Sequence, residues 1–361
     1  MKRTFLLIAA LLPAACGIAG AQNLRLLVGT YTEGSGSEGL YLYSYDVRNA
    51  ATTLLDSAPS GNPSFVILNE DATRAYSVNE FSDGREGVSS FVIEGNTIRP
   101  ESEAPIAGAA VKGGDPCNIL MTGDALLTSN YTGGSVSVFS LDGSGRIGEM
   151  TQYFDSPASH MHCAVTSPDG EYIFVTDLGG DRILRFRRTA YPWSPLGESV
   201  VAWQGNASLR YGPRHLVFSK DGRFAYLLCE LSDRLLCFSY SGGDLTPVQD
   251  IVAYRGKGGG SADIHLSPDG RFLYTSHRLK KDGISVFSID SASGQVKYAA
   301  FQKTGKHPRN FAVSPDGRFL LCACRDEGRI EIYGIDKGSG RLSPTGRSIK
   351  VPAPVCVQFI E

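Results

Sequence analysis

Cysteine is scarce in this sequence, and its distribution argues against two common kinds of site. Only eight of the 361 residues are cysteine, and no two of them form a CxxC pair. Seven lie scattered through apolar segments, at Cys117, Cys163, Cys229, Cys237, Cys322, Cys324 and Cys356. An odd, scattered set argues against a disulfide framework or a zinc site and favours buried free thiols. A nucleophilic Cys229 is the alternative, and it would need an accessible, electropositive setting.

Net charge and long apolar runs are also lacking. The formal net charge is −2, which gives no reason to expect nucleic acid as a partner. The longest apolar run, Phe5–Ala15, is shorter than the roughly 20 residues that a membrane helix needs. It follows Lys2 and Arg3 and precedes small residues up to Ala21, which is the layout of a signal peptide. We therefore expect residues 1–21 to be removed and the protein to be periplasmic or secreted, with lipoprotein processing at Cys16 as the minor alternative.

Several catalytic signatures are missing as well. The sequence contains no GxSxG elbow, no HExxH motif and no P-loop. The glycine-rich stretch Gly256–Gly260 lacks the strand-to-helix context of a phosphate-binding loop. No segment shows a convincing helical period. These absences leave an all-β fold whose chemistry must come from less familiar combinations of residues.

A repeated turn sets the expected architecture. The pattern SxDG occurs at Ser167–Gly170, Ser219–Gly222, Ser267–Gly270 and Ser314–Gly317, and weaker copies lie near Asp71 and Asp124. Successive aspartates are 45 to 53 residues apart. Each turn joins two apolar strands, and alternating strands such as GLYLYSYD and GISVFSID follow later in each unit. A period near 50 residues with strands throughout predicts a propeller of four-stranded antiparallel blades.

The two ends of the chain complete the number of blades. Residues 24–58 supply three strands with no first strand before them, and the segment after Pro354 supplies a single strand. Together they make one blade, which adds to six internal units. We therefore predict a single seven-bladed β-propeller domain over residues 22–361, closed so that no long sheet edge is free.

The unusual residues fall at corresponding places in the repeat. The first two strands of each unit form a hairpin, so the start of the first and the end of the second lie on one face of the disc. The strand-start segments include Asn118, His160, His162, Arg214, His215, Asp263, His265, His307 and Arg309. The strand-end segments include Asn79, Glu80, Asn130, Tyr131, Asp177, Glu230, His277 and Arg278. All six histidines of the chain are among these residues, which predicts a polar cluster at one mouth of the central channel.

The residue types in this cluster indicate its chemistry. Imidazoles and a carboxylate relay protons near neutral pH, and guanidinium groups bind carboxylate or phosphate and stabilise an oxyanion. The set suits hydrolysis or ring closure of an anionic ester without a cofactor. A metal is not favoured, because the nearby arginines would repel a cation. The alternative is a structural role, in which these groups bond to backbone and link adjacent blades; His277 and His307 are its first candidates.

Beyond these patterns, the sequence resembles a known family. GTYT at Gly29–Thr32, SHMH at Ser159–His162, GPRHLVFSKDGRFAYLLCEL, SPDGRFLYTSHR, HPRNFAVSPDGRF and the final PVCVQF occur in order. Together they resemble the seven-bladed propeller lactonases, which include bacterial 6-phosphogluconolactonases of the propeller type and fungal carboxy-cis,cis-muconate cyclases. The resemblance covers nearly all of the chain after residue 21.

The resemblance implies a site of histidine, arginine and glutamate at one channel mouth. Carried over by motif, the catalytic residues are His160, His162, Arg214, Glu230 and Arg278. The neighbouring His215, Asp177, His265, Arg309 and Asn118 are expected to bind substrate. The sequence departs from the family in having PCN rather than PCH at Asn118, and His277 where asparagine is commoner.

This set of residues predicts a lactonase mechanism. Glu230 or His162 would take a proton from the attacking water, and Arg214 and Arg278 would hold the oxyanion or an acidic group of the substrate. We expect a small anionic lactone as substrate and a monomeric enzyme. Phosphorylated sugar lactones are chiefly cytoplasmic, whereas the N-terminal segment predicts export. The prediction of lactonase activity is therefore firmer than the prediction of a phosphogluconate substrate. The alternatives are a noncatalytic propeller that binds a sugar acid or a protein at this mouth, and a lactonising cyclase of the muconate type.

Overall fold

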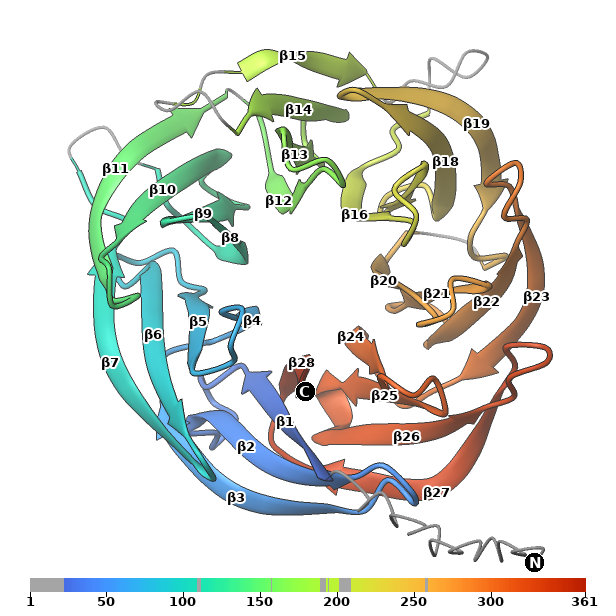
Figure 1. Cartoon of the computed structure of the whole chain (residues 1–361), viewed down its shortest axis with the longest axis horizontal. Helices are drawn as coiled ribbons and strands as arrows, with labels where there is room; N and C mark the ends of the chain where they lie inside the picture. Colours follow the sequence, from blue (N-terminus) through green and yellow to red (C-terminus); the bar gives the residue numbers. More distant parts are fainter. Residues whose placement is uncertain are drawn as a thin grey trace, which may run out of the picture.

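A computed structural model describes residues 23–361 except 109–111, 157, 189–192, 194, 201–208 and 257–258, and for residues 195–200 it describes the backbone alone. The predicted signal peptide, residues 1–21, lies outside the described residues. The described chain forms seven four-stranded antiparallel sheets arranged in a ring (Figure 1). The predicted seven-bladed β-propeller is therefore confirmed.

The SxDG turns begin this architecture locally. In the first of them, the Ser167 hydroxyl donates to Oδ1 of Asp169 at 2.6 Å and accepts from the backbone N–H of Tyr172 at 2.9 Å. Gly170 has a φ of 72°, a conformation that costs glycine little. The other three turns repeat these bonds, and the four turns join the first two strands of the fourth to seventh blades.

Each internal blade uses four consecutive strands, numbered from the channel outwards. The second blade contains β4 (Val66–Leu68), β5 (Arg74–Asn79), β6 (Gly87–Glu94) and β7 (Thr97–Pro105). The third contains β8 (Pro116–Thr122), β9 (Ala125–Asn130), β10 (Ser135–Leu141) and β11 (Ile147–Asp155). The fourth contains β12 (Met161–Thr166), β13 (Tyr172–Asp177), β14 (Arg182–Arg187) and β15 (Pro195–Val200).

The remaining internal blades follow the same order. The fifth contains β16 (Pro213–Phe218), β17 (Phe224–Cys229), β18 (Arg234–Ser241) and β19 (Asp244–Val252). The sixth contains β20 (Ser261–Leu266), β21 (Phe272–His277), β22 (Gly283–Ile289) and β23 (Val296–Lys303). The seventh contains β24 (Pro308–Val313), β25 (Phe319–Cys324), β26 (Arg329–Ile335) and β27 (Leu342–Lys350).

The first blade is built from both ends of the chain, as predicted. Its innermost strand is β28 (Pro354–Ile360), which is followed outwards by β1 (Asn23–Thr30), β2 (Gly39–Asp46) and β3 (Thr52–Pro59). β28 and β1 pair antiparallel, with Leu27 opposite Gln358 and Gly29 opposite Cys356. Figure 1 shows the red β28 beside the blue β1. This pairing closes the ring.

The hydrophobic core is divided among the interfaces between blades. One buried cluster combines Phe174 of the fourth blade with Leu216, Leu227 and Phe238 of the fifth. Another combines residues of the fifth and sixth blades, including Tyr226 and Leu273. Alternating side chains of the inner strands point into these interfaces, which is why the strands read as apolar. The innermost strands contact their neighbours around the ring and enclose the central channel.

Helical structure is nearly absent from the described residues. Its one instance there is a 3₁₀ turn, η1 (Arg325–Glu327), directly after β25. None of the described segments forms a helix of the length and apolarity required to span a bilayer.

Gly29 tests how tightly the closing blade packs on the second blade. A Cβ at this position would lie 2.2 Å from the Pro63 carbonyl oxygen and 2.9 Å from Cγ2 of Val66. We expect Gly29→Ala to lower the free energy of unfolding by about 1–3 kcal/mol, because the backbone of the neighbouring blade must move. Denaturant unfolding measures this change. Gly143→Ala is the control, since a Cβ there meets no atom within 4 Å; equal stability of both variants would contradict the close packing.

Candidate active site

Two positions of the repeat supply most of the side chains at one mouth of the channel. The first is the residue directly after the second strand of each blade. This position holds Tyr31, Glu80, Tyr131, Leu178, Glu230, Arg278 and Arg325. This residue follows the last paired residue of the strand. Its backbone therefore leaves the sheet at the point where the loops of this mouth begin. Six of the seven side chains are charged or phenolic, which makes this ring of positions a natural place for chemistry.

The second position is a β-bulge in the innermost strand. Pro213 pairs with Cys229 and His215 with Leu228, so Arg214 has no partner in the register. The same shift leaves Cys117, His162 and Arg309 unpaired in β8, β12 and β24. A bulge bends the strand and redirects the extra side chain. The strand pairing therefore determines which side chains of the strand-start segments point in a different direction from those of their neighbours.

These positions surround a cavity of about 340 Å³. Its walls are formed by Glu80, Asp115, Cys117, Tyr131, Thr132, His162, Glu230, Arg278 and Arg309. A second cavity of about 450 Å³ shares Glu80 and Asp115 with it and extends past Tyr31 and Arg325. Of the ten residues predicted for the site, His162, Glu230, Arg278 and Arg309 line the first cavity.

Glu230 occupies the centre of the charged network. Nε of Arg214 donates to its Oε2 at 2.8 Å, and a terminal nitrogen of Arg278 donates to its Oε1 at 2.9 Å. Burial opposes ionisation of Glu230, but the charges of Arg278, Arg214 and Arg309 outweigh it and hold the pKa of the carboxyl below its ordinary value. Burial and the charge of Arg214 lower the pKa of Arg278 to about 9, so this group stays charged at neutral pH. The cavity thus holds an ionised carboxylate between two guanidinium groups.

Arg214 lies behind the cavity wall. Its side chain is only 2 % exposed, and besides Glu230 it donates to the carbonyl oxygen of Ala262 and approaches Nε2 of His215 at 3.3 Å. Its contacts are therefore with protein groups. This placement gives Arg214 the task of holding Glu230, whereas Arg278 and Arg309 face the cavity.

Arg309 and Glu80 form another part of the wall, and Tyr31, which lines the adjoining cavity, contacts both. A terminal nitrogen of Arg309 lies 3.4 Å from both Glu80 oxygens, and the Tyr31 hydroxyl donates to Glu80 at 2.8 Å. The Arg309 guanidinium also lies over the Tyr31 ring, 5.5 Å from its centroid. Burial raises the pKa of Tyr31 far above its ordinary value, so the phenol remains a hydrogen-bond donor. Glu80 in turn keeps acceptor capacity toward the cavity.

Two buried polar atoms of the cavity wall have no hydrogen-bond partner among the described residues. They are Nε of Arg278 and Nδ1 of His162. Burial and the charge of Arg214 lower the pKa of His162 well below the ordinary value, so the ring is neutral. Leaving a buried donor or acceptor unpaired costs about 1–3 kcal/mol. These atoms are the groups that a bound molecule would satisfy.

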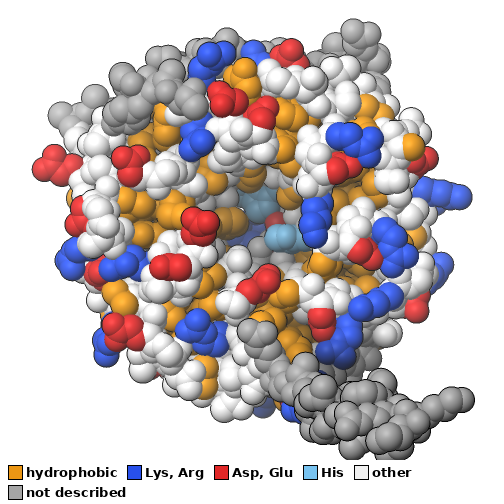
Figure 2. All heavy atoms as spheres, viewed as in Figure 1, with side chains coloured by type: hydrophobic (Ala, Val, Ile, Leu, Met, Phe, Trp, Pro, Cys, Tyr) orange, Lys and Arg blue, Asp and Glu red, His pale blue; other side chains and the backbone are white. Residues whose placement is uncertain are grey.

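His215 and His265 form a second polar cluster around Asp263. Nδ1 of His215 lies 2.8 Å from Oδ1 of Asp263, and Nε2 of His265 lies 2.9 Å from Oδ2. Burial and the charge of Arg214 lower the pKa of His215 to about 4. Burial acts in the same direction on His265, but the charge of Asp263 raises its pKa above the ordinary value. Figure 2 shows histidine side chains within the central hollow of the disc.

Three other predicted residues lie outside the cavity wall. His160 stacks on Tyr131 and its Nδ1 lies 2.9 Å from the Tyr131 carbonyl oxygen. Asp177 is fully buried, where it accepts hydrogen bonds from Ser159, Arg182 and two backbone N–H groups. The side-chain oxygen of Asn118 accepts from the backbone N–H of Ala164 in the next blade.

The structure explains why Asp177 and His277 differ from the cavity residues. Both are the last residue of a second strand. Their side chains therefore project from a face of the sheet into the interface between blades. His277 bonds to Ser261 and Thr275 and stacks on Tyr254, and burial lowers its pKa to about 3. The expected structural role of His277 matches these contacts. His307, the other candidate for such a role, instead approaches Arg278 at 3.3 Å.

Sequence reasoning missed several wall residues. Glu80, Tyr31 and Tyr131 were not among the predicted site residues, although each occupies the same repeat position as Glu230 and Arg278. Aligning the seven units on the end of the second strand would have found them. Cys117 and Asp115 also line the cavity, and both precede Asn118 in the strand-start segment.

The seven described cysteines are all free and buried, as predicted. Cys229 has no exposed surface, and burial raises the pKa of its thiol well above the ordinary value. The alternative of a nucleophilic Cys229 is therefore wrong, since a reactive thiol needs access and a lowered pKa. Within the described ranges, no group of three or more histidine, cysteine, aspartate or glutamate side chains is placed to hold a metal ion.

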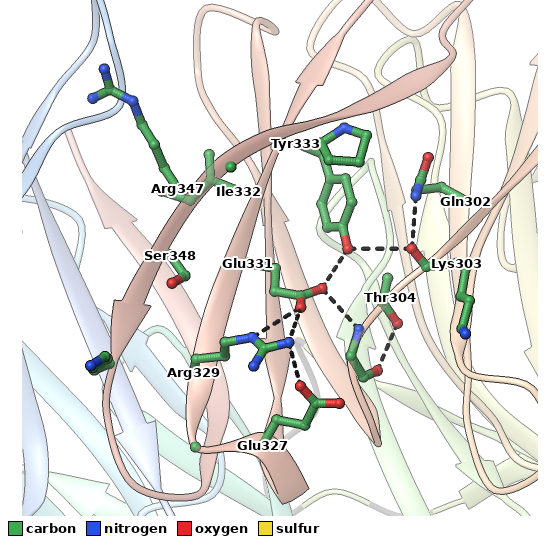
Figure 3. A pocket seen from close by; sticks show the side chains of 15 residues that line it. Gln302, Lys303, Thr304, Glu327, Arg329, Glu331, Ile332, Tyr333, Arg347 and Ser348 are labelled. Atoms are coloured by element: carbon green, nitrogen blue, oxygen red, sulfur yellow. Dashed lines mark hydrogen bonds and ion pairs between the residues drawn. The ribbon is translucent and has the colours of Figure 1, made fainter.

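A larger cavity than the one at the channel mouth lies at the outer side of the sixth and seventh blades. It measures about 880 Å³, and Figure 3 shows Glu331 in its wall, bonded to Arg329 and to the Tyr333 hydroxyl. Glu331 also accepts from the backbone N–H of Gly305, and Arg329 pairs with Glu327. No buried side-chain nitrogen or oxygen of its described wall lacks a partner. We therefore place the candidate site at the channel mouth.

The fold and the cavity at the channel mouth define a propeller with a carboxylate–guanidinium site. Comparison with known proteins identifies its family. Residues 25–359 match the family described as "Lactonase, 7-bladed beta-propeller". The chain therefore belongs to the seven-bladed β-propeller lactonases.

Individual relatives cover almost the whole chain. A 6-phosphogluconolactonase of Bacillus subtilis is 31% identical, over 92% of this chain and 97% of its own. The crystal structure of a Bacteroides uniformis protein, 39% identical, superimposes with a TM-score of 0.87 over 94% of this chain and 99% of its own. The structure of a periplasmic gluconolactonase from Pseudomonas aeruginosa, 30% identical, gives a TM-score of 0.81 over 94% and 99%. Family and relatives agree on a hydrolase that opens lactones.

Proposed function

We propose that the protein hydrolyses a sugar-acid lactone in the cavity at the channel mouth, with Glu230 as general base. The observation that carries this proposal is the Glu230 carboxylate, which lines the cavity and receives one guanidinium on each oxygen. The names of the relatives support lactones of gluconate as the substrate class, with or without a phosphate group.

The reaction can be followed atom by atom. Glu230 takes a proton from water, and the water oxygen forms a bond to the lactone carbonyl carbon. The carbonyl oxygen becomes an oxyanion, which Arg278 and Arg309 stabilise from the cavity wall. When the tetrahedral intermediate collapses, the ring C–O bond breaks and the leaving oxygen receives the proton from Glu230. The product is the open hydroxy acid.

The electrostatics of the cavity favour this assignment of the base. Proton transfer to Glu230 removes a negative charge from the guanidinium cluster, while the oxyanion restores a negative charge nearby. Arg214 and Arg278 therefore face one negative charge throughout, so little new charge has to be buried. The neutral His162 ring can orient the water without competing for its proton. Arg214 acts through Glu230 in this scheme and is a positioning residue.

The wall also suits the rest of such a substrate. Arg278 and Arg309 attract a molecule that carries or develops negative charge, which supports an anionic lactone. The carboxylates of Glu80 and Asp115 offer acceptors for sugar hydroxyl groups. We infer a monomeric enzyme, because the seven blades close into a ring within this chain.

Replacing Glu230 tests the proposed base. We expect Glu230→Gln to lower kcat on gluconolactone and on 6-phosphogluconolactone by roughly 10²–10⁴-fold, because the amide accepts no proton from water. Initial rates are measured above the spontaneous hydrolysis, and thermal unfolding shows whether the fold persists. Glu171→Gln, at an exposed residue beside a hairpin turn, is the matched control. A folded Glu230→Gln variant with normal turnover would contradict the assignment. Comparing the wild-type rates on the two substrates shows how much the phosphate group contributes.

The pH dependence gives an independent check. The pKa of Glu230 is lowered in the folded protein, so the ionised base is present above that pKa and is lost as the pH falls through it. We therefore expect kcat/KM to stay level from pH 7 to about 5 and to fall only below the ordinary glutamate range, about 4.3. A loss of activity centred near pH 6.5 would indicate a base with the ordinary pKa of histidine instead.

We also propose that the protein is exported after removal of residues 1–21. The layout of the N-terminal segment supports this, and the Pseudomonas aeruginosa relative is described as periplasmic. Expression of the full chain in a Gram-negative host should give a periplasmic protein. Its mass should match a chain that starts at Gln22. A lipid-modified N-terminus at Cys16 would establish lipoprotein processing, and a cytoplasmic protein that retains Met1 would contradict export.

A further inference from the structure

Two chains of Asp, His and Arg converge on the Glu230 carboxylate, one on each oxygen. In the inner chain, Asp263 contacts His215 at 2.8 Å, His215 contacts Arg214 at 3.3 Å, and Arg214 donates to Oε2 of Glu230 at 2.8 Å. In the outer chain, Asp326 lies 3.5 Å from His307, His307 lies 3.3 Å from Arg278, and Arg278 donates to Oε1 at 2.9 Å. The order of groups is the same in both.

The inner chain determines which nitrogen of His215 carries the proton. A carboxylate is only an acceptor, so Nδ1 of His215 must donate to Asp263. The ring is neutral, because burial and the charge of Arg214 lower the pKa of His215 to about 4. Nε2 is therefore a free acceptor, and it faces a donor nitrogen of Arg214. Asp263 thus orients Arg214 through the tautomer of one histidine.

Asp263 itself is held rigidly. Its Oδ1 also accepts from the backbone N–H of Ile264, and its Oδ2 accepts from the side chain of Asn310, the backbone N–H of Phe311 and the ring of His265. These partners belong to the innermost strands of the sixth and seventh blades. Burial opposes ionisation of Asp263, but the charge of His265 and the bond from His215 hold its pKa well below the ordinary value.

The outer chain is looser. Asp326 is 44% exposed, and Nε of Arg325 donates to its other oxygen at 2.6 Å. A pair at 3.5 Å in partial contact with solvent restrains its partner weakly. The inner chain is therefore the one that can fix the position of Glu230.

We propose that Asp263 and His215 are positioning residues for the reaction, which hold Arg214 on Glu230 and so keep this carboxylate in place and ionised. The proposal rests on the function proposed above for Glu230. Neither residue lines the cavity, and both act through Arg214. Asp326 and His307 have the corresponding place in the outer chain, with a smaller effect.

An asparagine at position 263 weakens the inner chain in either orientation of its amide group, because it also removes the negative charge that His215 and His265 contact. If the NH₂ replaces Oδ2, it faces two donors, the Asn310 side chain and the Phe311 N–H. If it replaces Oδ1, it donates to Nδ1 of His215, and the ring proton moves to Nε2. That proton then points at a donor nitrogen of Arg214, so the contact with Arg214 becomes repulsive.

The groups around Glu230 set the expected change in its titration. Arg278, Arg214 and Arg309 lower its pKa, and the charge of Glu230 in turn raises the pKa of Tyr131 and of Asp233. Displacing Arg214 from Glu230 weakens the cationic field around the carboxyl group. We therefore expect the pKa of Glu230 to rise when the inner chain is broken.

The experiment compares Asp263→Asn, His215→Leu and His215→Gln with the wild type. We expect the first two to lower kcat about 10- to 100-fold and to move the acid limb of kcat/KM to higher pH. Glutamine at position 215 can donate to Asp263 and accept from Arg214, so His215→Gln should retain more activity and a nearly normal limb. His215→Leu keeps the test open if Asp263→Asn fails to fold.

Tyr274→Phe is the matched control, because the buried Tyr274 hydroxyl donates to the Gly340 carbonyl oxygen of the seventh blade and belongs to neither chain. It should lower thermal stability while leaving kcat and the acid limb unchanged. Asp326→Asn should change kcat by less than about threefold, since the outer ion pair is partly exposed. If Asp263→Asn or His215→Leu folds and keeps the kcat and limb of the wild type, the inference is overturned while lactonase activity stands.

A readout without turnover separates this inference from the proposed function. In protein labelled with ¹³C at the glutamate carboxyl, the Glu230 signal is the one that Glu230→Gln removes, and its pH titration reports the pKa directly. A raised pKa in Asp263→Asn and His215→Leu supports the positioning chain even if neither lactone is hydrolysed, in which case the proposed function fails alone. An unchanged pKa of Glu230 in both variants overturns the inference that Asp263 and His215 are positioning residues.

Discussion

Closure of the ring by β28 and β1 is the constraint on which the rest of the structure depends. Each blade buries its faces only against its two neighbours, so a missing blade would expose two apolar interfaces. The pairing of residues near the two ends of the chain prevents this. Closure also fixes the distance between blades across the channel, which allows Glu80 in the second blade to meet Arg309 in the seventh. The cavity therefore exists only in the closed ring.

The charges at the mouth are balanced within this ring. Arg214 and Arg278 share Glu230, and Arg309 adjoins Glu80, so nearly every buried charge has an opposite charge within hydrogen-bond distance or slightly beyond it. Removing two ions from water is costly, and only good geometry with further hydrogen bonds offsets that cost. The site thus pairs its buried charges with one another, and the guanidinium groups that line the cavity can act on a molecule inside it.

Much of this structure could be predicted from the sequence, because the deciding signals are local. The SxDG turn determines the inner hairpin of four blades through bonds among residues five apart or fewer, as the contacts of Ser167 and Asp169 show. The spacing of these turns then predicts the blades, and the lone strand after Pro354 predicts the shared blade. His162, Glu230, Arg278 and Arg309 were found because strand starts and ends meet on one face in any hairpin.

The remaining details depend on contacts that no local pattern contains. A one-residue difference separates Asp177 and His277, which point into blade interfaces, from Glu230 and Arg278, which follow their strands. The bulge at Arg214 is visible only in the pairing of β16 with β17. The link from Asp263 to His215 joins two blades at a separation of 48 residues, and nothing in either segment alone indicates it.

The residue after each second strand has a consequence for how such a protein can change over time. The scaffold repeats seven times, but this one position holds tyrosine, glutamate, leucine or arginine in different blades. Its side chain is not part of the strand pairing that stabilises the ring. Point substitutions there can alter the charge and shape of the cavity while the blades stay intact. A symmetrical ring can therefore acquire new substrate preferences one side chain at a time, without a change of fold.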